Sequence, residues 1–487
     1  MVHSLYQSLN NLETIYADRI GIRYYDEAKG GVVEVPFRQY AADLRRFVAF
    51  LRSRTPNPLG QRVAILARNS YHYVMCMYGA VLAGAVAVPL NTGKNWDEIR
   101  YEIRYELDLV EPVCVLHDGE YLSREPALGQ AYGDRLVPMD AFTAFEPAME
   151  ITEVPDLSAM AFIMFTSGTT GRSKGVMLSQ KNLFTAMPAF LTPFEDVRSQ
   201  TGWNTDAFSS LSCLPMFHIS AMTSLVSWSI TGHCVNLCND LKYFYRDLGA
   251  MRSDVMAVVP VLLKSIYHDV MKGKRERLNG LRMLTCGAAM FDPAMLQDLM
   301  DRGFFIAQMY GLTETCGDGA WNSSQEEKYL TSVGHVDDSC QYKLEDGELC
   351  MRGDPVMLGY YKDPEATAEV LDAEGWFHTG DIARVEPDGY MYLTGRKKNV
   401  IILGSGENVS PEELEKLLAP CAAIRECRVC ERNQRICAVV CCEADQQDAV
   451  RDFVTKVNRT LPLYKHMVVE FSAQPLPRNA AGKLLRS

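Results

Sequence analysis

Short apolar runs alternate with amphipathic segments from about residue 60 to residue 310. Runs of strand length lie at 62–66, 160–165 and 255–259, and helix-like amphipathic segments lie between such runs. Alternation of strands and helices along a chain is typical of α/β proteins, because each helix covers the sheet that its neighbouring strands build. The pattern therefore predicts an α/β domain whose sheets are largely parallel.

A later run shows the same unit in detail. The apolar residues 280–285 lead through Cys286-Gly-Ala-Ala289 to Asp292 and Pro293. Aspartate followed by proline is a typical helix cap and first-turn pair. We therefore expect a helix to begin there and to end at Gly303.

The uncharged run 73–90 is long enough to raise the question of a membrane span. Gly84 and Pro89 interrupt the run. The pattern favours a buried helix over 71–83, a stop at Gly84 and a core strand over 85–90. We therefore expect no membrane span.

The pattern changes in the last third of the chain. Residues 346–393 form short alternating runs separated by turns, which predicts antiparallel β structure. A polar, charged segment at 395–399 ends this region. Beyond it, 400–403 is predicted to be a strand, and Ser410 opens a helix through a capping box.

Length and composition bound the architecture. With 487 residues the chain is too long for one ordinary core and should divide into two or more domains. The polar segment at 395–399 places a boundary there, between domains 1–395 and 396–487. The hydrophobic content of 47% and the charged content of 23% are those of a folded globular protein. The net charge of −12 argues against sequence-independent nucleic-acid binding, which requires basic surface.

Fifteen cysteines, together with an N-terminus that lacks a secretory signal, predict a cytoplasmic protein with reduced thiols. Five of the cysteines cluster at 427–442, where Cys427 and Cys430 have the spacing of a metal-binding pair. No second such pair or nearby histidine completes a zinc site. The alternation around a polar turn instead favours a β-hairpin in which cysteine acts as a small hydrophobe.

The segment from Thr166 to Gly175 combines hydroxyls, glycines and one lysine directly after a predicted strand. Glycine lets backbone N–H groups approach phosphate oxygens closely, and Lys174 adds a positive charge. The spacing is not that of a P-loop, because Lys174 stands three residues after Gly171 and precedes a glycine. We predict a phosphate-binding loop, although turns of this composition also occur as solvated connections. Its candidate phosphate ligands are Thr166, Ser167, Gly168, Thr169, Thr170, Gly171 and Lys174.

Further segments follow this loop along the chain. They are Tyr310-Gly-Leu-Thr-Glu314, Asp346-Gly-Glu-Leu-Cys350 with Gly359-Tyr-Tyr361, Thr379-Gly-Asp381, Gly395-Arg396 with Gly406-Glu-Asn-Val-Ser-Pro-Glu-Glu413, and Pro477-Arg-Asn-Ala-Ala-Gly-Lys483. Together and in this order, they resemble the adenylate-forming superfamily of acyl- and aryl-CoA synthetases, adenylation domains and luciferases. The resemblance spans nearly the whole chain.

The resemblance implies a large α/β N-terminal domain that binds ATP, with a small antiparallel β subdomain, and a small mobile α+β C-terminal domain. It also implies two half-reactions. A carboxylate attacks the α-phosphate of ATP and gives acyl-AMP and pyrophosphate. A thiol, for which CoA is the expected acceptor, then takes the acyl group and releases AMP. Because two anions must meet, groups that neutralise the phosphates are the main requirement.

The resemblance also implies roles for single residues. The loop residues hold the β- and γ-phosphates, and Thr313 adds a hydroxyl near the α-phosphate. Glu314 is the implied Mg²⁺ ligand, since magnesium takes few carboxylates and keeps phosphate oxygens and waters. Asp381 is the implied acceptor of the ribose hydroxyls, with Arg396 on the ribose and phosphate side. The remaining implied nucleotide contacts are Gly287, Ala288, Ala289, Tyr310 and Gly311.

By resemblance, Lys483 stabilises the charge that grows between carboxylate and α-phosphate in the first half-reaction. A lysine so close to a terminus is otherwise commonly a solvated tail residue. Lys398 occupies the hinge position of the family, where a change of backbone torsion would turn the C-terminal domain between the half-reactions. An exposed linker lysine is the alternative interpretation of Lys398.

His218 resembles the aromatic gate of the acyl pocket in relatives, and Met309 is a second candidate for the pocket wall. A lone histidine in an apolar segment is more often a core residue, so we assign His218 no proton transfer. Met216, Met222 and Trp228 suggest an apolar pocket but are also ordinary core residues. The segment around His218 contains no aspartate that could pair with a substrate ammonium, which favours an acid without an α-amine.

Two departures from the family pattern affect these expectations. Ser173 stands where the loop commonly has proline, which is expected to loosen the loop. Gly404-Ser-Gly406 has a residue between glycines where many relatives have adjacent glycines, in the region that lines the pantetheine path. The acceptor therefore stays open between CoA and a separate acyl carrier protein, and a non-catalytic acyl- or nucleotide-binding regulator is the remaining alternative.

Overall fold

The computed structural model describes residues 2–93, 96–166, 172–204, 206–287, 290–403, 408–432 and 435–477. The chain divides into two compact units. The first unit comprises the described residues of 1–92, 96–341 and 351–377, and the second those of 93–95, 342–350 and 378–487.

The first unit contains a mixed nine-stranded sheet with the order β15-β14-β13-β12-β11-β9-β10-β1-β2. The strands from β1 to β13 in this order are parallel to one another, and β2, β14 and β15 pair antiparallel at the two edges. Their bounds are β1 Ile20–Asp26, β2 Gly31–Pro36, β9 Ser209–Ser212, β10 Cys234–Leu237, β11 Val255–Val258, β12 Met283–Cys286, β13 Phe305–Gly311, β14 Gly319–Asn322 and β15 His335–Val336.

A seven-stranded sheet in the same unit has the order β18-β8-β7-β4-β3-β5-β6. Its strands from β7 to β6 are parallel, while β8 and β18 continue the sheet antiparallel. Their bounds are β3 Arg62–Leu66, β4 Val86–Pro89, β5 Cys114–His117, β6 Leu136–Pro138, β7 Met160–Thr166, β8 Lys174–Ser179 and β18 Gly359–Tyr360.

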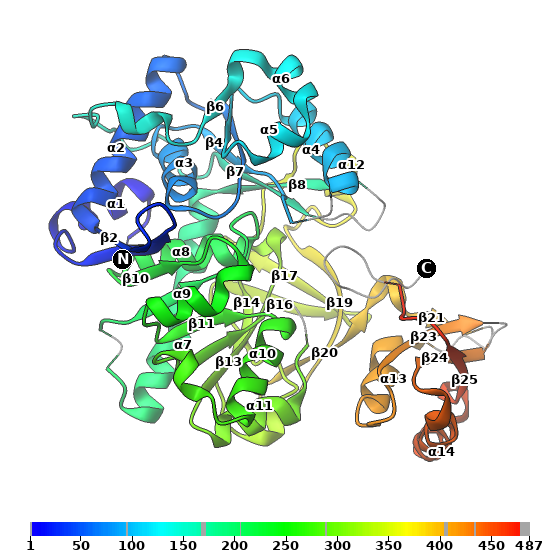
Figure 1. The fold of residues 1–487 in the computed structure, drawn as a ribbon. Helices are drawn as coiled ribbons and strands as arrows, with labels where there is room; N and C mark the ends of the chain where they lie inside the picture. Colours follow the sequence, from blue (N-terminus) through cyan, green and yellow to red (C-terminus); the bar gives the residue numbers. More distant parts are fainter. Residues whose placement is uncertain are drawn as a thin grey trace. The chain divides into compact units, whose positions relative to one another are not determined.

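Helices cover both faces of both sheets (Figure 1). Helices α1, α2, α3, α7 and α8 pack in the shared core between the sheets, α9 to α11 cover the other face of the nine-stranded sheet, and α4 to α6 cover the outer face of the seven-stranded sheet. The bounds are α1 Leu5–Thr14, α2 Phe37–Arg54, α3 Tyr71–Leu82, α4 Trp96–Val110, α5 Glu120–Arg124, α6 Pro126–Tyr132, α7 Gln180–Thr201, α8 Ile219–Ile230, α9 Phe244–Ala250, α10 Pro260–Met271, α11 Pro293–Asp301 and α12 Pro364–Ala368.

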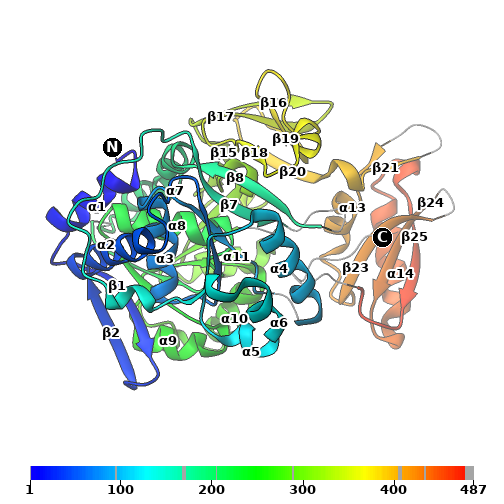
Figure 2. The same ribbon diagram turned by 90° about the horizontal axis from the view of Figure 1, so that it is seen from above.

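The alternation of side chains along each strand produces these two-sided cores. On β3, Val63 and Ile65 point into the shared core, whereas Ala64 and Leu66 point into the outer one. Successive strand residues face opposite sides of a sheet, so a strand buried on both faces is apolar throughout. This is why the apolar runs of the sequence locate these strands. Figure 2 shows the helices of the shared core from above.

The second unit contains the C-terminal elements. A three-stranded sheet of order β23-β24-β25 carries α13 and α14 through an apolar core, and β21 pairs antiparallel with β22. A four-stranded sheet, β16-β17-β19-β20, has most of its residues in this unit. The bounds are β16 Cys340–Glu345, β17 Glu348–Gly353, β19 Phe377–Val385, β20 Met391–Arg396, β21 Ile401–Ile402, β22 Asn408–Val409, α13 Pro411–Leu418, β23 Glu426–Arg432, β24 Arg435–Cys441, α14 Gln447–Asn458 and β25 Met467–Ser472.

Several sequence predictions are confirmed locally. Helix α3 ends before Gly84, whose φ is +87°, and β4 follows it, as the pattern of 71–90 predicted. The cysteine-rich segment forms the antiparallel hairpin β23–β24, and all fifteen cysteines are free thiols. Within the part of the chain that the structure describes, no helix combines the length and apolar character needed to cross a membrane.

The predicted domain boundary at 395/396 is a different division from that of the compact units. The units group residues 342–350 and 378–395 with the C-terminal segment, whereas the predicted boundary follows the polar segment at 395–399. The boundary at 395/396 and the hinge at Lys398 stay predictions.

Gly79 allows α3 to pack directly against α2. A Cβ atom at this position would lie 2.6 Å from Cδ1 and 2.8 Å from Cβ of Phe47, a side chain with 0% exposure. Overpacking of a core commonly costs about 1–3 kcal/mol. We therefore expect Gly79→Ala to lower the thermal unfolding midpoint by several degrees, measured by circular dichroism.

Gly129→Ala is the matched control. It lies within α6 with no atom inside 4 Å of an added Cβ. Alanine is favoured over glycine in a helix by about 1 kcal/mol, so this variant should keep or raise the midpoint. An equal loss in both variants would contradict the packing argument.

Candidate active site

Several predicted site residues of the first unit stand at the carboxyl ends of strands in the nine-stranded sheet. Gly287 follows β12, Gly311 ends β13, and Thr313 and Glu314 lie in the short 3₁₀ turn Thr313–Thr315. His218 follows β9 and caps α8. Because β9, β12 and β13 are parallel, these residues all stand at carboxyl ends of strands, which is where open α/β sheets bind ligands.

Gly311 permits the sharp turn that presents Thr313 and Glu314. A Cβ atom at Gly311 would lie 2.1 Å from the carbonyl oxygen of Gly317, so the chain returns across position 311 at backbone distance. Thr315 Oγ1 accepts a hydrogen bond of 3.1 Å from the Leu312 N–H and closes the turn. Any larger residue at 311 would displace the turn and, with it, the carboxylate of Glu314.

The predicted phosphate loop begins and ends on paired strands. Thr166 ends β7 and Lys174 begins β8, and the two residues are direct register partners. Thr166 Oγ1 lies 3.5 Å from the Lys174 carbonyl oxygen. Five predicted phosphate ligands, Ser167, Gly168, Thr169, Thr170 and Gly171, lie outside the described residues. The loop is therefore anchored at the carboxyl end of β7.

Tyr360 connects the phosphate-loop lysine with the predicted magnesium ligand. Its hydroxyl donates a hydrogen bond of 2.9 Å to Glu314 Oε1, and Lys174 Nζ lies 4.9 Å from the centre of its ring. Strand β18 places the tyrosine there by pairing with β8, with Tyr360 opposite Val176. Burial raises the pKa of the Tyr360 hydroxyl, and the nearby Glu314 raises it further. The hydroxyl thus stays protonated and acts as a donor.

No role for Tyr360 was predicted from the sequence. Gly359-Tyr-Tyr361 marked the family resemblance, but a tyrosine at the end of an antiparallel region carries no sign of its partner. Its contacts could have been predicted only by placing 359–361 as a strand beside the phosphate loop. Alternate side chains of such a strand point to the same face of the sheet. Tyr360 contacts both Lys174 and Glu314, which come from the two sheets.

Gly287 directly follows β12, and Tyr310 lies in the neighbouring strand β13. A Cβ atom at Gly287 would lie 3.4 Å from the carbonyl oxygen of Met309, and Tyr310 is half-buried. Ala288 and Ala289 lie outside the described residues.

The candidate acyl-pocket residues divide into two groups. His218 is exposed, with its ring 4.5 Å from that of Phe217, and Met309 is partly buried against the shared core. Met216 and Met222 have 0% exposure within that core. His218 and Met309 are therefore accessible enough to contact a ligand, whereas Met216 and Met222 are core residues.

In the second unit, Asp381 and Arg396 form an ion pair. Asp381 ends the Thr379-Gly-Asp381 segment of β19 and is the register partner of Arg396 on β20. Arg396 Nε lies 2.7 Å from Asp381 Oδ1, and Asp381 is only 5% exposed. Arg396 Nη1 also donates to the Thr379 carbonyl at 3.1 Å. The pair presents a fixed carboxylate with further lone pairs available as acceptors.

Glu348 supports this pair from β17. Its Oε1 accepts from the Gly380 N–H at 3.0 Å, and its Oε2 lies 2.7 Å from Lys397 Nζ. Burial alone would raise the pKa of the Glu348 carboxyl, but hydrogen bonds from Lys397, His378 and Gly380 lower it below its ordinary value. Lys397 thus forms an ion pair with Glu348 of β17. The hinge at Lys398 stays a prediction. Lys483 lies outside the described residues.

One group of potential metal ligands occurs among the described residues. Ligand atoms of Glu345, Cys350 and His378 lie within 4.8 Å of one another, with Cys350 Sγ 3.4 Å from His378 Nδ1. Burial raises the pKa of the Cys350 thiol to about 11, so the thiol is neutral at physiological pH. His378 Nδ1 contacts both Cys350 Sγ and Glu348 Oε2, and we interpret the group as a hydrogen-bonded cluster.

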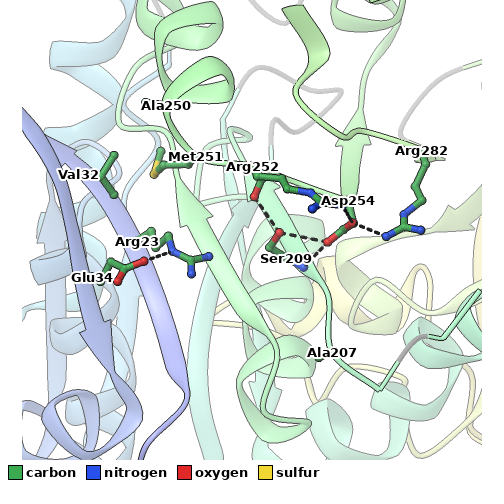
Figure 3. A pocket seen from close by; sticks show the side chains of 10 residues that line it. All are labelled: Arg23, Val32, Glu34, Ala207, Ser209, Ala250, Met251, Arg252, Asp254 and Arg282. Atoms are coloured by element: carbon green, nitrogen blue, oxygen red, sulfur yellow. Dashed lines mark hydrogen bonds and ion pairs between the residues drawn. The ribbon is translucent and has the colours of Figure 1, made fainter. Parts of the chain in front are cut away.

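A polar cavity of about 610 Å³ lies at the amino ends of strands in the nine-stranded sheet (Figure 3). Its charged residues pair with one another: Arg23 Nε is 2.7 Å from Glu34, and Arg282 Nη2 is 2.6 Å from Asp254. Ser209, Asp254 and Arg282 stand at the amino ends of β9, β11 and β12. The cavity is therefore separate from the candidate active site.

Comparisons with known proteins show the family to which the chain belongs. Residues 17–361 match the family of AMP-binding enzymes, and the chain belongs to this family. A 2-succinylbenzoate–CoA ligase from Bacillus cytotoxicus is 27% identical, and the match covers 88% of the chain and 87% of the relative. A long-chain-fatty-acid–CoA ligase, FadD13, from Mycobacterium tuberculosis is 28% identical with the same coverage.

Solved structures of CoA synthetases have a similar fold. O-succinylbenzoate coenzyme A synthetase (MenE) from Bacillus subtilis, in complex with ATP and magnesium ion, matches with a TM-score of 0.78 at 25% identity and covers 98% of each chain. Its complex with the acyl-adenylate intermediate OSB-AMP matches with a TM-score of 0.79 at 25% identity, over 98% and 96% of the two chains. The predicted family, fold class and enzyme class, an AMP-forming acid–thiol ligase, are confirmed.

Tyr360→Phe tests the connection between the two sheets. The variant removes the hydrogen bond to Glu314 and leaves the ring beneath Lys174. Hydrogen bonds to charged groups contribute about 1.5–3 kcal/mol, so we expect at least about a tenfold rise in the KM for MgATP, measured by pyrophosphate exchange. Tyr361→Phe removes the neighbouring hydroxyl and should change this constant little. Equal constants in the two variants would contradict the assignment.

Asp318 is a buried carboxyl group near the turn that carries Glu314. It is 2% exposed, accepts a 2.7 Å hydrogen bond from the Gly319 N–H and is bonded by the Ser339 hydroxyl. Burial raises its pKa to about 7, against about 3.9 for an unperturbed aspartate. Between these values the folded protein keeps a proton that the unfolded chain has released. The contribution of Asp318 to stability therefore falls as the pH rises from 4 to 7.

Asp318→Asn removes this titration. We expect the unfolding midpoint of the variant, taken relative to the parent at each pH, to increase from about pH 5 to about pH 8. Differential scanning calorimetry across this range measures the difference, in which the other titrating groups largely cancel. A difference independent of pH would contradict the raised pKa.

Proposed function

We propose that this enzyme activates a carboxylic acid with ATP, releases pyrophosphate and transfers the acyl group to the thiol of CoA, giving acyl-CoA and AMP. The observation that carries the proposal is the group formed by Lys174, Tyr360 and Glu314. Lys174, from the hairpin of β7 and β8, lies over the ring of Tyr360, and Glu314, from the other sheet, accepts a hydrogen bond from its hydroxyl. A cation and a metal-binding carboxylate held together suit a magnesium triphosphate.

The donor set of the site fits Mg²⁺. Glu314 offers one half-buried carboxylate oriented by Tyr360, and magnesium characteristically takes one or two carboxylates together with substrate phosphates and waters. When bound, the ion would neutralise phosphate charge. Thr313 follows the carboxyl end of β13 beside Glu314 and would donate its hydroxyl near the α-phosphate. Lys174, with the loop residues from Thr166 to Gly171, would hold the β- and γ-phosphates.

The remaining roles follow the family pattern. Gly287 to Ala289, Tyr310 and Gly311 would contact the nucleotide, and Asp381, oriented by Arg396, would accept the ribose hydroxyls. Lys483 would stabilise the charge that develops as the carboxylate attacks the α-phosphate, and Lys398 would act as hinge. The named relatives are CoA ligases, which supports ATP, Mg²⁺ and CoA as the reaction partners.

We infer that the substrate is a carboxylic acid without an α-amine. Its acyl group would lie against His218 and Met309, neither of which offers a carboxylate for an ammonium group. CoA is proposed as the acceptor over a carrier protein because the relatives carry CoA in their names. Free thiols at all fifteen cysteines support a cytoplasmic location, where thiols stay reduced.

Pyrophosphate exchange into ATP tests the proposal directly. The purified enzyme, with Mg²⁺, would be assayed over a panel of aliphatic and aromatic acids, and we expect exchange that depends on the acid. Product formation with free CoA is then compared with loading of a phosphopantetheine carrier protein. Silence across a broad panel with folded protein would contradict the enzyme activity, and loading of the carrier alone would correct the acceptor.

Lys483→Ala tests the separation of the two half-reactions. The variant should abolish formation of acyl-AMP, because the charge on the attacking carboxylate and α-phosphate is no longer stabilised. Thioester formation from supplied acyl-AMP and CoA should remain close to that of the parent enzyme. Chromatography of the two products measures both steps. Equal loss in both half-reactions would contradict the role given to Lys483.

A further inference from the structure

Glu106 is a buried carboxylate on an otherwise apolar face of α4. The helix packs on the seven-stranded sheet through Ile103, Leu107 and Val110, which are spaced as one side of a helix. Glu106 lies on the same side and has 0% exposure. Because burial of an ionisable group is costly unless the group is partnered, a glutamate at this position requires a specific interaction.

Ser173 supplies that interaction. Its Oγ donates a hydrogen bond of 2.8 Å to Glu106 Oε1, and Ser173 is itself only 4% exposed. The preceding residue, Arg172, places its guanidinium 5.4 Å from the centre of the Tyr105 ring. Two successive residues before β8 are thus held by two successive residues of α4.

Helix α4 also holds the segment that follows Tyr360. Lys362 Nζ donates to the Leu109 carbonyl at 2.9 Å and pairs with Glu111 at 3.1 Å. Lys174 and Tyr360 contact each other. Each lies close in sequence to a residue that is hydrogen-bonded to α4, namely Ser173 and Lys362. Loss of the hydrogen bond at Ser173 would release the start of β8, where Lys174 stands.

We propose that Glu106 is a positioning residue for Lys174. Its hydrogen bond to Ser173 fixes the start of β8 and takes the place of the backbone constraint that proline provides at this position in the common form of the loop. The inference rests on the proposed function, since Lys174 is taken to hold the β- and γ-phosphates. Serine at 173 is therefore an anchored residue, which runs counter to the loosening expected from the sequence.

The two half-reactions separate this role from a general effect on folding. Adenylation uses the triphosphate, whereas a supplied acyl-adenylate carries no β- or γ-phosphate. Loss of the hydrogen bond should therefore weaken the use of ATP and leave the second half-reaction unchanged. A merely structural contribution of Glu106 would affect both alike.

The test compares Ser173→Ala, Glu106→Leu and Glu106→Gln. The first two remove the hydrogen bond, and we expect each to raise the KM for MgATP in pyrophosphate exchange by at least about tenfold. Glu106→Gln keeps an acceptor oxygen and should stay within about threefold of the parent enzyme, within the usual spread of such effects. Thioester formation from supplied acyl-adenylate and CoA should proceed at the parental rate in all three variants.

Ser253→Ala is the matched control. Ser253 has 0% exposure, accepts a hydrogen bond of 2.8 Å from Asn236 Nδ2 and lies at the opposite edge of the nine-stranded sheet. Its loss should lower the unfolding midpoint without changing the KM for MgATP. An unchanged KM in Ser173→Ala, or equal losses in both half-reactions, would overturn the positioning role. Absence of exchange in the parent enzyme would overturn the proposed function as well.

Discussion

The hydrogen bond from Tyr360 to Glu314 is the contact on which the candidate site depends. The hairpin of β7 and β8, which carries Lys174, belongs to the seven-stranded sheet. The turn that carries Glu314 follows β13 of the nine-stranded sheet. Each sheet carries predicted phosphate or magnesium contacts near the carboxyl ends of its parallel strands. A triphosphate needs both sets at once, and Tyr360 holds a residue of each set in contact.

The electrostatic requirement explains why this contact is half-buried. The chain has a net charge of −12, so its overall field does not attract an anion such as ATP. Local groups must do so, and two unit charges about 4 Å apart attract about four times more strongly at an effective dielectric constant of about 20 than in water. Lys174 beside the buried ring of Tyr360, together with the carboxylate of Glu314, provides this local environment.

Much of the fold could be predicted from the sequence because strands buried on both faces are apolar throughout. Residues 62–66 coincide with β3, and the run at 71–90 separates into α3 and β4. The N-terminal hairpin β1–β2 was not predicted. It joins β10, more than 190 residues away, and local periodicity carries no information about such distant partners.

The candidate site divides in the same way. The sequence predicted roles for Thr166, Lys174, Glu314 and Asp381, because each of them stands in a short motif of the residue types that the proposed chemistry requires. It did not locate the partners that orient them. Arg396 was expected near the ribose, but its ion pair with Asp381 depends on strand register. Glu106 carried a weak signal, an acidic residue within an apolar helix face, whose meaning depended on the distant Ser173.

The central claim is that the carboxylate oxygen of the substrate attacks the α-phosphate of ATP. The most direct measurement is to supply an accepted acid labelled with oxygen-18 in its carboxyl group, with ATP, Mg²⁺ and CoA, and to weigh the products by mass spectrometry. Attack at the α-phosphate leaves one labelled oxygen in AMP and none in pyrophosphate. Label in a phosphate or pyrophosphate product, with unlabelled AMP, would contradict the account.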